Sequence, residues 1–378
     1  MFLSLYLLIK KGSVMKVSRS LLSIIVMVVF YACSSQEYTT AKLAIQQSDF
    51  EKAAEWLPKA MAVEPDNPEI PIVMAVEIHA EKEEWIEMVA LFNKAMELNP
   101  EKVIEIRGSF IPVKDAVNNY TEFYWAKEFN KGVEQFKKIQ NDSDNKTQYL
   151  DVAIAHFKNA VIVKPSDANT YTTLAKCYMD IGDNKKARDA VKDAVLKDPD
   201  SFDSNFSAGQ ILGKIGEDTK DILPYFQKAV EIEPSNSKAL RELAGVYYDI
   251  GEKEESIKIF TNAIENEDDK IIKADLYYNL GVIHNQMKNY EESEIAFDEA
   301  VFHNDKDYEA MLGMVNSYEN IAAEFVQNER FNDAYKWYRK AEKKLKSLRD
   351  LDFENENIYD KQLKILQQRR DYAEGQIK

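Results

Sequence analysis

The stretch YTTLAKCYMDIGDNKKARDAVKDAVLKDP, residues 171–199, decides the fold of this chain. Its large residues Tyr171, Leu174 and Tyr178 recur at steps of three and four, which is the spacing of one face of an α-helix. Gly182 follows that face. Glycine tolerates the left-handed conformation in which many helices end, so Gly182 marks the end of the first helix. The stretch ends with a proline. Proline cannot continue a helix, so the second helix ends before it. The stretch therefore predicts two helices joined by a short turn.

Small residues in the same stretch predict how the two helices pack. An alanine lets a neighbouring helix approach closely, and one alanine in each predicted second helix can be followed along the whole chain. Successive members are separated by 35, 65, 34, 35, 34, 37 and 41 residues. They are Ala60, Ala95, Ala160, Ala194, Ala229, Ala263, Ala300 and Ala341. The sequence therefore repeats one structural unit with a period of about 34 residues.

The repeated pattern resembles the tetratricopeptide repeat (TPR) family. Leu243, Ala244 and Gly251 return at the positions of Leu174, Ala175 and Gly182, and a third copy is centred on Gly281 and Phe297. The resemblance implies an all-α fold, a right-handed superhelical solenoid of helix-turn-helix repeats with a concave groove. We expect the array to cover residues 41–350.

Two repeats are longer than the others. The second has seven residues more than 34, about two helical turns, so we expect its first helix to run from about residue 308 to 328. In the first, we favour one long helix over residues 114–140, followed by a polar loop over residues 141–146. A degenerate extra repeat hidden in residues 101–147 is the alternative.

The end of the chain predicts one further helix. Residues 356–377 carry apolar side chains at helical spacing, within a C-terminal segment that we place at residues 351–378. A solenoid otherwise leaves the apolar face of its last repeat in water, so this helix is expected to cap the array.

The N-terminal residues predict export. Lys16 and Arg19 precede an apolar run over residues 21–31, the order of a secretory signal, so we expect a start at Met15 and a signal peptide within residues 1–32. The residues before Cys33 resemble a bacterial lipobox, which implies lipidation of Cys33 by palmitate-type acyl chains, a lipidated tether over residues 33–40, and membrane anchoring. An ordinary cleaved signal, or a signal anchor with Cys33 incidental, is the alternative.

Composition argues against several classes of ligand. The formal net charge of −16 repels phosphate backbones, so nucleic acid is not an expected partner. The 2 cysteines and 4 histidines are scattered, and neither a metal site nor a cofactor is predicted. No small-molecule substrate is expected. The basic cluster near the C-terminus, residues 336–349, is interpreted as a solvated helix face rather than a site for an anionic partner.

The resemblance also implies where a partner binds. In the TPR family, variable residues of the first helices line the groove and select a protein or peptide, and tyrosine and arginine are common at binding hot spots. The expected groove residues are Asn169, Thr172, Lys176, Met179, Asp180, Lys238, Arg241, Tyr248, Asp249, Asp275, Tyr278, Asn285 and Gln286. Lys238 and Arg241 lack matching basic residues in the preceding repeats, which argues against a clamp for an acidic peptide end.

The sequence predicts a scaffold for protein–protein interaction and not an enzyme. It contains no GxSxG elbow, P-loop or glycine-rich dinucleotide turn. We expect a lipoprotein of the bacterial cell envelope, on the periplasmic side of the outer membrane, acting within a membrane-associated assembly. A soluble exported or cytoplasmic TPR adaptor and a non-catalytic accessory subunit of a cell-envelope hydrolase are the alternatives. The partner, its biological process, the membrane face and the oligomeric state stay open.

Overall fold

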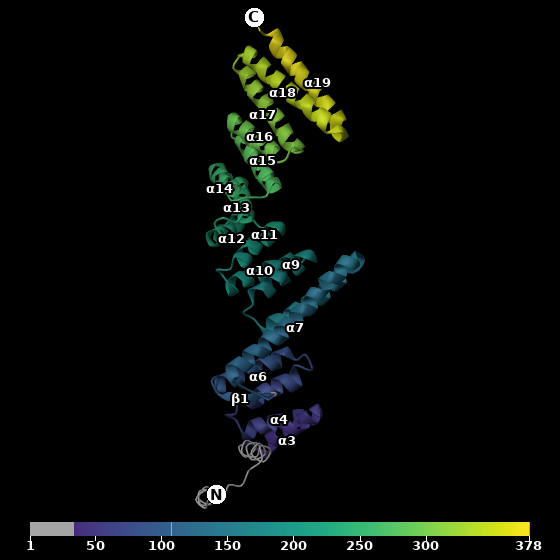
Figure 1. Ribbon diagram of the computed structural model, residues 1–378, viewed down its shortest axis with the longest axis vertical. Helices are drawn as coiled ribbons and strands as arrows, with labels where there is room; N and C mark the ends of the chain where they lie inside the picture. Colours follow the sequence, from purple (N-terminus) through teal and green to yellow (C-terminus); the bar gives the residue numbers. More distant parts are fainter. Residues whose placement is uncertain (1–33, 107, 378) are drawn as a thin grey trace, which may run out of the picture. The chain divides into compact units, whose positions relative to one another are not determined.

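The computed structural model describes residues 34–106 and 108–377, and the chain divides into two compact units between Asp167 and Ala168 (Figure 1). The predicted signal peptide, the start at Met15 and the lipidated Cys33 lie outside the described residues. Each unit is a succession of helix pairs connected by short turns.

Unit 1, as described from residue 34 to 167, contains three helix pairs and a small hairpin. Its third helix, α5, continues into a π-helical turn, η1, before the chain reverses. The elements are α3 (Gln36–Gln46), α4 (Phe50–Val63), α5 (Glu69–Met74), η1 (Ala75–His79), α6 (Trp85–Leu98), β1 (Val103–Ile106), β2 (Ser109–Pro112), α7 (Val113–Asn141), η2 (Ser143–Asn145) and α8 (Lys146–Val163).

Unit 2, residues 168 to 377 as described, contains five helix pairs and a final helix. The elements are α9 (Ala168–Asp180), α10 (Asn184–Lys197), α11 (Phe202–Lys214), α12 (Thr219–Ile232), α13 (Ser237–Asp249), α14 (Lys253–Glu265), α15 (Lys270–Gln286), α16 (Tyr290–His303), α17 (Tyr308–Gln327), α18 (Phe331–Leu351), η3 (Phe353–Asn355) and α19 (Glu356–Gly375). The predicted all-α repeat solenoid is confirmed.

The repeated alanines lie where the helices of each unit pack together. All eight alanines that mark the period are 0% exposed. Because an alanine adds only a methyl group beyond the backbone, it allows the close approach that a larger side chain would prevent. Their complete burial is what the prediction of close helix packing requires.

The long helices fall where the sequence places them. Helix α7 occupies Val113–Asn141, against an expected 114–140, and pairs with α8. Helix α17 occupies Tyr308–Gln327, against an expected 308–328. The segment 101–147 therefore holds no extra repeat among its described residues.

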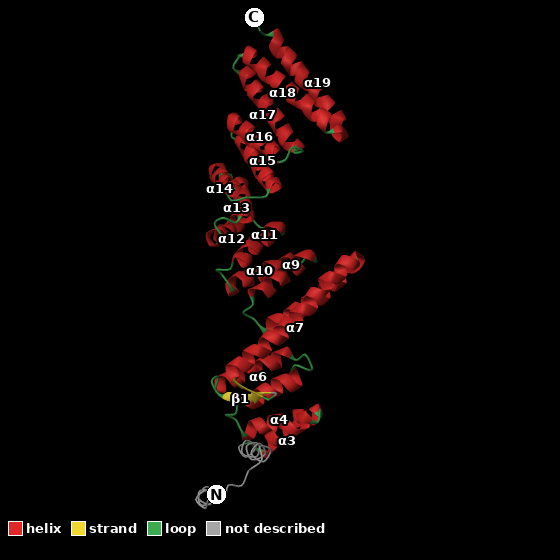
Figure 2. Ribbon diagram, viewed as in Figure 1, coloured by secondary structure: helices red, strands yellow, loops and turns green. Residues whose placement is uncertain are grey.

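A two-stranded hairpin precedes α7 and was not predicted (Figure 2, yellow). β1 and β2 are antiparallel, with Ile104 opposite Ile111, and Gly108 adopts a φ of +80° in the connection. Ile104 is buried against the core of unit 1. Strands of four residues are too short for their alternation to stand out in the sequence.

The boundary of the expected tether is wrong. Residues 36–40, placed in a tether over residues 33–40, belong to helix α3, which begins at Gln36. Ser35 caps this helix, since its hydroxyl accepts a hydrogen bond from the Tyr38 backbone N–H at 3.1 Å. Tyr38 is buried, and its hydroxyl donates to Glu69 at 2.6 Å. A polar composition hid the helix, because serine and threonine favour helix starts as well as loops.

Seven of the turns between paired helices contain one residue in the left-handed conformation. Glycine occupies three of these positions, Gly182, Gly216 and Gly251, with φ between 79° and 91°. Residues other than glycine occupy the other four positions, with backbone φ angles between 52° and 63°. They are Ser48, Glu83, Lys288 and Glu329. These four turns carry strain that glycine would relieve.

Replacing Glu329 with glycine is therefore expected to stabilise the protein by about 0.5–1 kcal/mol, because glycine adopts positive φ without a clash at Cβ. Urea unfolding followed by circular dichroism measures the change. Glu329→Ala is the matched control, since it also removes the carboxylate but keeps Cβ. Equal midpoints for the glycine and alanine variants would contradict the explanation.

Candidate partner-binding groove

The first helices of the repeats carry all the residues that the sequence places in a groove. Within unit 2, α11 packs against α9, and α17 packs against α15, so first helices of successive repeats are neighbours. Seven of the expected residues are exposed and five are half-buried. The exposed ones are Asn169, Lys176, Asp180, Lys238, Asp249, Asp275 and Gln286; the half-buried ones are Met179, Arg241, Tyr248, Tyr278 and Asn285.

The prediction that Thr172 lines the groove is wrong. Its side chain is only 4% exposed, and its hydroxyl donates to the Ala168 carbonyl at 3.2 Å. A buried threonine that bonds to its own helix has no surface to offer a partner. The residue was assigned by its repeat position alone, and repeat position does not distinguish the edge of the core from the groove.

A pocket of about 430 Å³ lies between α15 and α17. Three of the expected groove residues line it, namely Tyr278, Asn285 and Gln286. The complete lining is Tyr278, Val282, Asn285, Gln286, Phe297, Glu309, Leu312, Gly313 and Asn316. Its volume is in the lower part of the range of roughly 300–1,000 Å³ that is typical of ligand pockets.

Phe297 of α16 is fixed between the two helices that form the pocket. A Cβ atom on Gly281 of α15 would lie 2.8 Å from the Phe297 ring, and one on Gly313 of α17 would lie 2.6 Å from it. Only glycine fits at such distances unless the ring moves. The Tyr278 ring packs against the same phenylalanine, with centroids 5.8 Å apart. The aromatic part of the pocket is therefore held rigidly.

Amide groups on α15 are also held in place. The Gln286 side chain donates a hydrogen bond to the Tyr248 hydroxyl of α13 and accepts one from Lys253 at 3.1 Å. Asn285 accepts a hydrogen bond from the Asn320 amide of α17 at 3.1 Å. These contacts bring the expected residue Tyr248 next to the pocket and connect three successive repeats.

The electrostatic environment of the pocket is acidic. Glu309 is the only charged residue in its lining, and it forms no ion pair with the described residues. Burial raises the pKa of Tyr278, and the negative charges of Glu309 and Asp307 raise it further. Burial and Asp307 also raise the pKa of Asp275, while the positive charge of Arg241 opposes that shift.

Several expected residues do not join this pocket. Those on α9 and the α13 residues Lys238 and Asp249 are absent from its lining, while α17 supplies four lining residues that were not predicted. No usable signal for them was present in the sequence, because the alanines that mark the period and enclose α15 and α17 are separated by 37 and 41 residues rather than by 34. The repeat register therefore could not be carried from α15 to α17.

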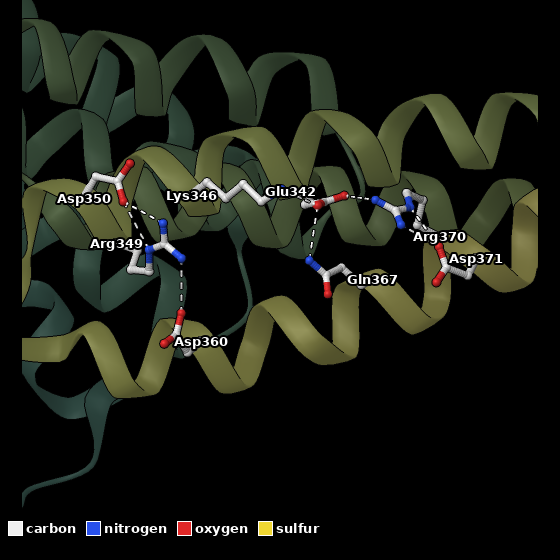
Figure 3. A network of polar contacts seen from close by, with 8 residues as sticks. All are labelled: Glu342, Lys346, Arg349, Asp350, Asp360, Gln367, Arg370 and Asp371. Atoms are coloured by element: carbon white, nitrogen blue, oxygen red, sulfur yellow. Dashed lines mark hydrogen bonds and ion pairs between the residues drawn. The ribbon is translucent and has the colours of Figure 1, made fainter.

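Most basic residues of α18 are exposed, as expected of a solvated helix face, but Lys346 and Arg349 bond to acidic groups of the protein (Figure 3). Glu342 is 6% exposed and accepts hydrogen bonds from Lys346 and from the α19 residues Gln367 and Arg370. Arg349 bonds to Asp350 and to Asp360 of α19. Arg349, Gln367 and Arg370 therefore join α19, the last helix, to α18.

A metal site and an activated cysteine each have structural requirements that residues 34–106 and 108–377 do not meet. No cluster of three metal-ligating side chains is found there. Cys177 is buried, and burial raises the pKa of its thiol to about 12, so it is not an activated nucleophile. Over the same residues, no helix is both long and apolar enough to cross a membrane.

Comparisons with known proteins agree with the repeat pattern. Two family profiles, both described as tetratricopeptide repeat, match residues 150–208 and 274–301. No curated protein matches the chain.

Solved structures give partial likenesses. MamA is 22% identical over 49% of this chain and 94% of its own, with a TM-score of 0.40. YrrB, described as a TPR protein with an unusual peptide-binding site, is 22% identical over 58% of this chain and 95% of its own, with a TM-score of 0.39. The C-terminal part of a TPR repeat-containing protein from Cytophaga hutchinsonii is 13% identical over 73% of this chain and 99% of its own, with a TM-score of 0.41.

Proposed function

Because this chain is a tetratricopeptide repeat protein, we propose that it is a scaffold, anchored in the bacterial envelope, that holds a segment of a partner protein in its groove. The observation that carries the groove proposal is the pocket between α15 and α17. The first helices of two neighbouring repeats line this pocket, and aromatic rings, side-chain amides and a carboxylate all belong to its lining. Such a combination of apolar lining and a few polar groups is typical of a binding site.

The anchoring part of the proposal is supported by sequence. A basic region, an apolar run and Cys33 follow one another in the order of a lipoprotein signal. Helix α3 begins at Gln36, three residues after Cys33. A lipid on Cys33 would therefore hold the first repeat close to the membrane surface, and several acyl chains make such attachment durable.

One experiment tests both parts. Cells that express the chain are grown with radiolabelled palmitate, and the protein is then purified from membranes under mild detergent. The wild type is expected to carry label and a reproducible protein partner, whereas Cys33→Ala should carry no label. Asn316→Trp should keep the label and lose the partner, because the indole would fill a pocket whose volume is about 430 Å³.

The matched control is Asn332→Trp, which adds the same bulk at an exposed position of α18. Equal labelling of the wild type and Cys33→Ala would overturn the anchor and favour an exported or cytoplasmic adaptor. Equal recovery of the partner by the two tryptophan variants would overturn the groove. A cell-wall hydrolase as the recovered partner would identify the chain as an accessory subunit.

A further inference from the structure

The lining of the α15–α17 pocket restricts the chemistry of what can occupy it. Its one charge is the Glu309 carboxylate, which is exposed and forms no ion pair with the described residues. An acidic side chain would be repelled by this carboxylate. A purely apolar one would remove water from the carboxylate and the amides without replacing their hydrogen bonds, which is unfavourable.

A cation meets complementary groups at several points of the same pocket. Tyr278 presents an aromatic ring, and ring faces attract cations. Glu309 belongs to the same lining, and the negative charges of Glu309 and Asp307 add to the effect of burial in raising the pKa of Tyr278. No lysine or arginine belongs to the lining, although the Lys253 ammonium of α14 bonds to the Gln286 amide oxygen at 3.1 Å.

The amide groups favour a planar, multiple donor over a point charge. Asn316 carries an amide in the pocket wall, and the amide oxygens of Asn285 and Gln286, which each already accept one hydrogen bond, keep a second lone pair for a ligand. A guanidinium offers five N–H donors in a fixed plane, can bond to a carboxylate, and stacks on an aromatic ring. An ammonium offers the same charge without the flat surface.

We propose that the pocket between α15 and α17 receives an arginine side chain of the partner, with Glu309 binding the guanidinium and Tyr278 packing against it. This inference rests on the proposed function, since it names the chemistry of the segment that the groove would hold. Arg241 stays outside the pocket, where its positive charge acts on Asp275. The pocket volume of about 430 Å³ accommodates one long side chain and the adjoining backbone.

The test uses the purified full chain and pools of acetylated hexapeptides. Each pool has randomised flanking residues and one fixed central residue: arginine, lysine, citrulline or glutamate. Fluorescence anisotropy is then used to measure the dissociation constants of the strongest binders. We expect affinity to fall from arginine to lysine to citrulline, and replacement of arginine by citrulline to weaken binding about tenfold, the usual effect of losing one charge-assisted hydrogen bond.

Glu309→Gln is expected to weaken the arginine peptide about tenfold and to leave the citrulline peptide unchanged, because it removes the charge and keeps the shape. The matched control is Glu291→Gln, which changes the same charge at an exposed position of α16 outside the pocket and should leave both affinities unchanged.

The outcomes separate this inference from the proposed function. If peptides bind and Asn316→Trp abolishes their binding, but arginine is not preferred or Glu309→Gln has no effect, the arginine inference fails and the groove stands. A preference for glutamate would also overturn the inference. If the wild-type chain binds none of the pools, both the inference and peptide recognition by this groove fail.

Discussion

Replacing Phe157 with alanine is expected to lower the free energy of unfolding of unit 1 by about 3–5 kcal/mol, the usual loss for a fully buried phenylalanine. Phe157 lies on α8 and is 0% exposed. Its ring packs against Phe129 and Phe136 of α7, at centroid distances of 5.2 and 6.2 Å. A Cβ on Gly132 would lie 2.6 Å from the ring, so the two helices approach closely around it.

Urea unfolding followed by tryptophan fluorescence measures this loss. Three of the 4 tryptophans belong to unit 1, and replacing Trp337 with phenylalanine leaves a signal that comes from that unit alone. The control is Phe123→Ala, since Phe123 lies on α7 and is 61% exposed. Phe123→Ala should change the free energy of unfolding by no more than about 0.5 kcal/mol. A similar loss for both variants would mean that burial against α7 does not explain the stability of this helix pair.

Gly132 illustrates why sequence could predict the helix and not its packing. Periodicity was enough to predict a helix over residues 114–140, although glycine inside a helix is unfavourable by roughly 1 kcal/mol. The reason for the glycine becomes visible only when Phe157, 25 positions later, is placed on it. Gly281 and Gly313 take the same role around Phe297. The helix propensities of single residues carry no information about such contacts between helices.

The candidate site was predictable to a similar depth. Its helices and three lining residues follow from the repeat register, since first helices of successive repeats are neighbours. Thr172 was wrong because a register position does not reveal whether a side chain faces the core. The acidic character of the pocket depends on Glu309, which was not predicted because the longer α17 repeat departs from the register of the shorter repeats. The hairpin was missed because its short strands lack a readable alternation.

The left-handed turns show a related limit. A search for glycine finds Gly182 and Gly251 but misses the equivalent turns at Lys288 and Glu329, where the backbone has the same shape. The repeat imposes the conformation through packing of the paired helices, and the side chain tolerates it. A glycine at the turn position therefore helps to locate this repeat, but a repeat can lack it.

Loss of the Glu128 carboxylate is expected to destabilise unit 1 as strongly as loss of Phe157. Glu128 of α7 is 0% exposed, and Lys131 donates to it at 2.7 Å. From α8, Nδ1 of His156 and the Asn159 amide lie 2.9 Å from its other oxygen. Glu128→Ala leaves His156 and the Asn159 amide without this acceptor, while Lys131 keeps Glu83 at 2.7 Å; a buried ionic contact that loses one partner costs about 3–5 kcal/mol.

The contribution of Glu128 should also depend on pH. Burial alone would raise the pKa of Glu128, but hydrogen bonds from His156, Lys131 and Asn159 outweigh burial and lower the pKa from its ordinary value of 4.5. A carboxyl group with a lowered pKa in the folded state stabilises the protein above its unfolded pKa. That stabilisation is lost as the pH falls through the folded pKa, because the folded state must then bind a proton that it disfavours.

The stability difference between the wild type and Glu128→Gln should therefore be constant from pH 7 to about pH 5 and should narrow below about pH 4.5. Urea unfolding at each pH, in the Trp337→Phe background, gives this difference directly. Glu134→Gln is the matched control, because Glu134 is exposed on the same helix and its loss should change stability little at any pH. A difference that stays constant through pH 4 would show that Glu128 acts by shape alone. A narrowing difference would show that the negative charge of Glu128 helps to hold α8 against α7, in addition to the packing of the buried Ala160.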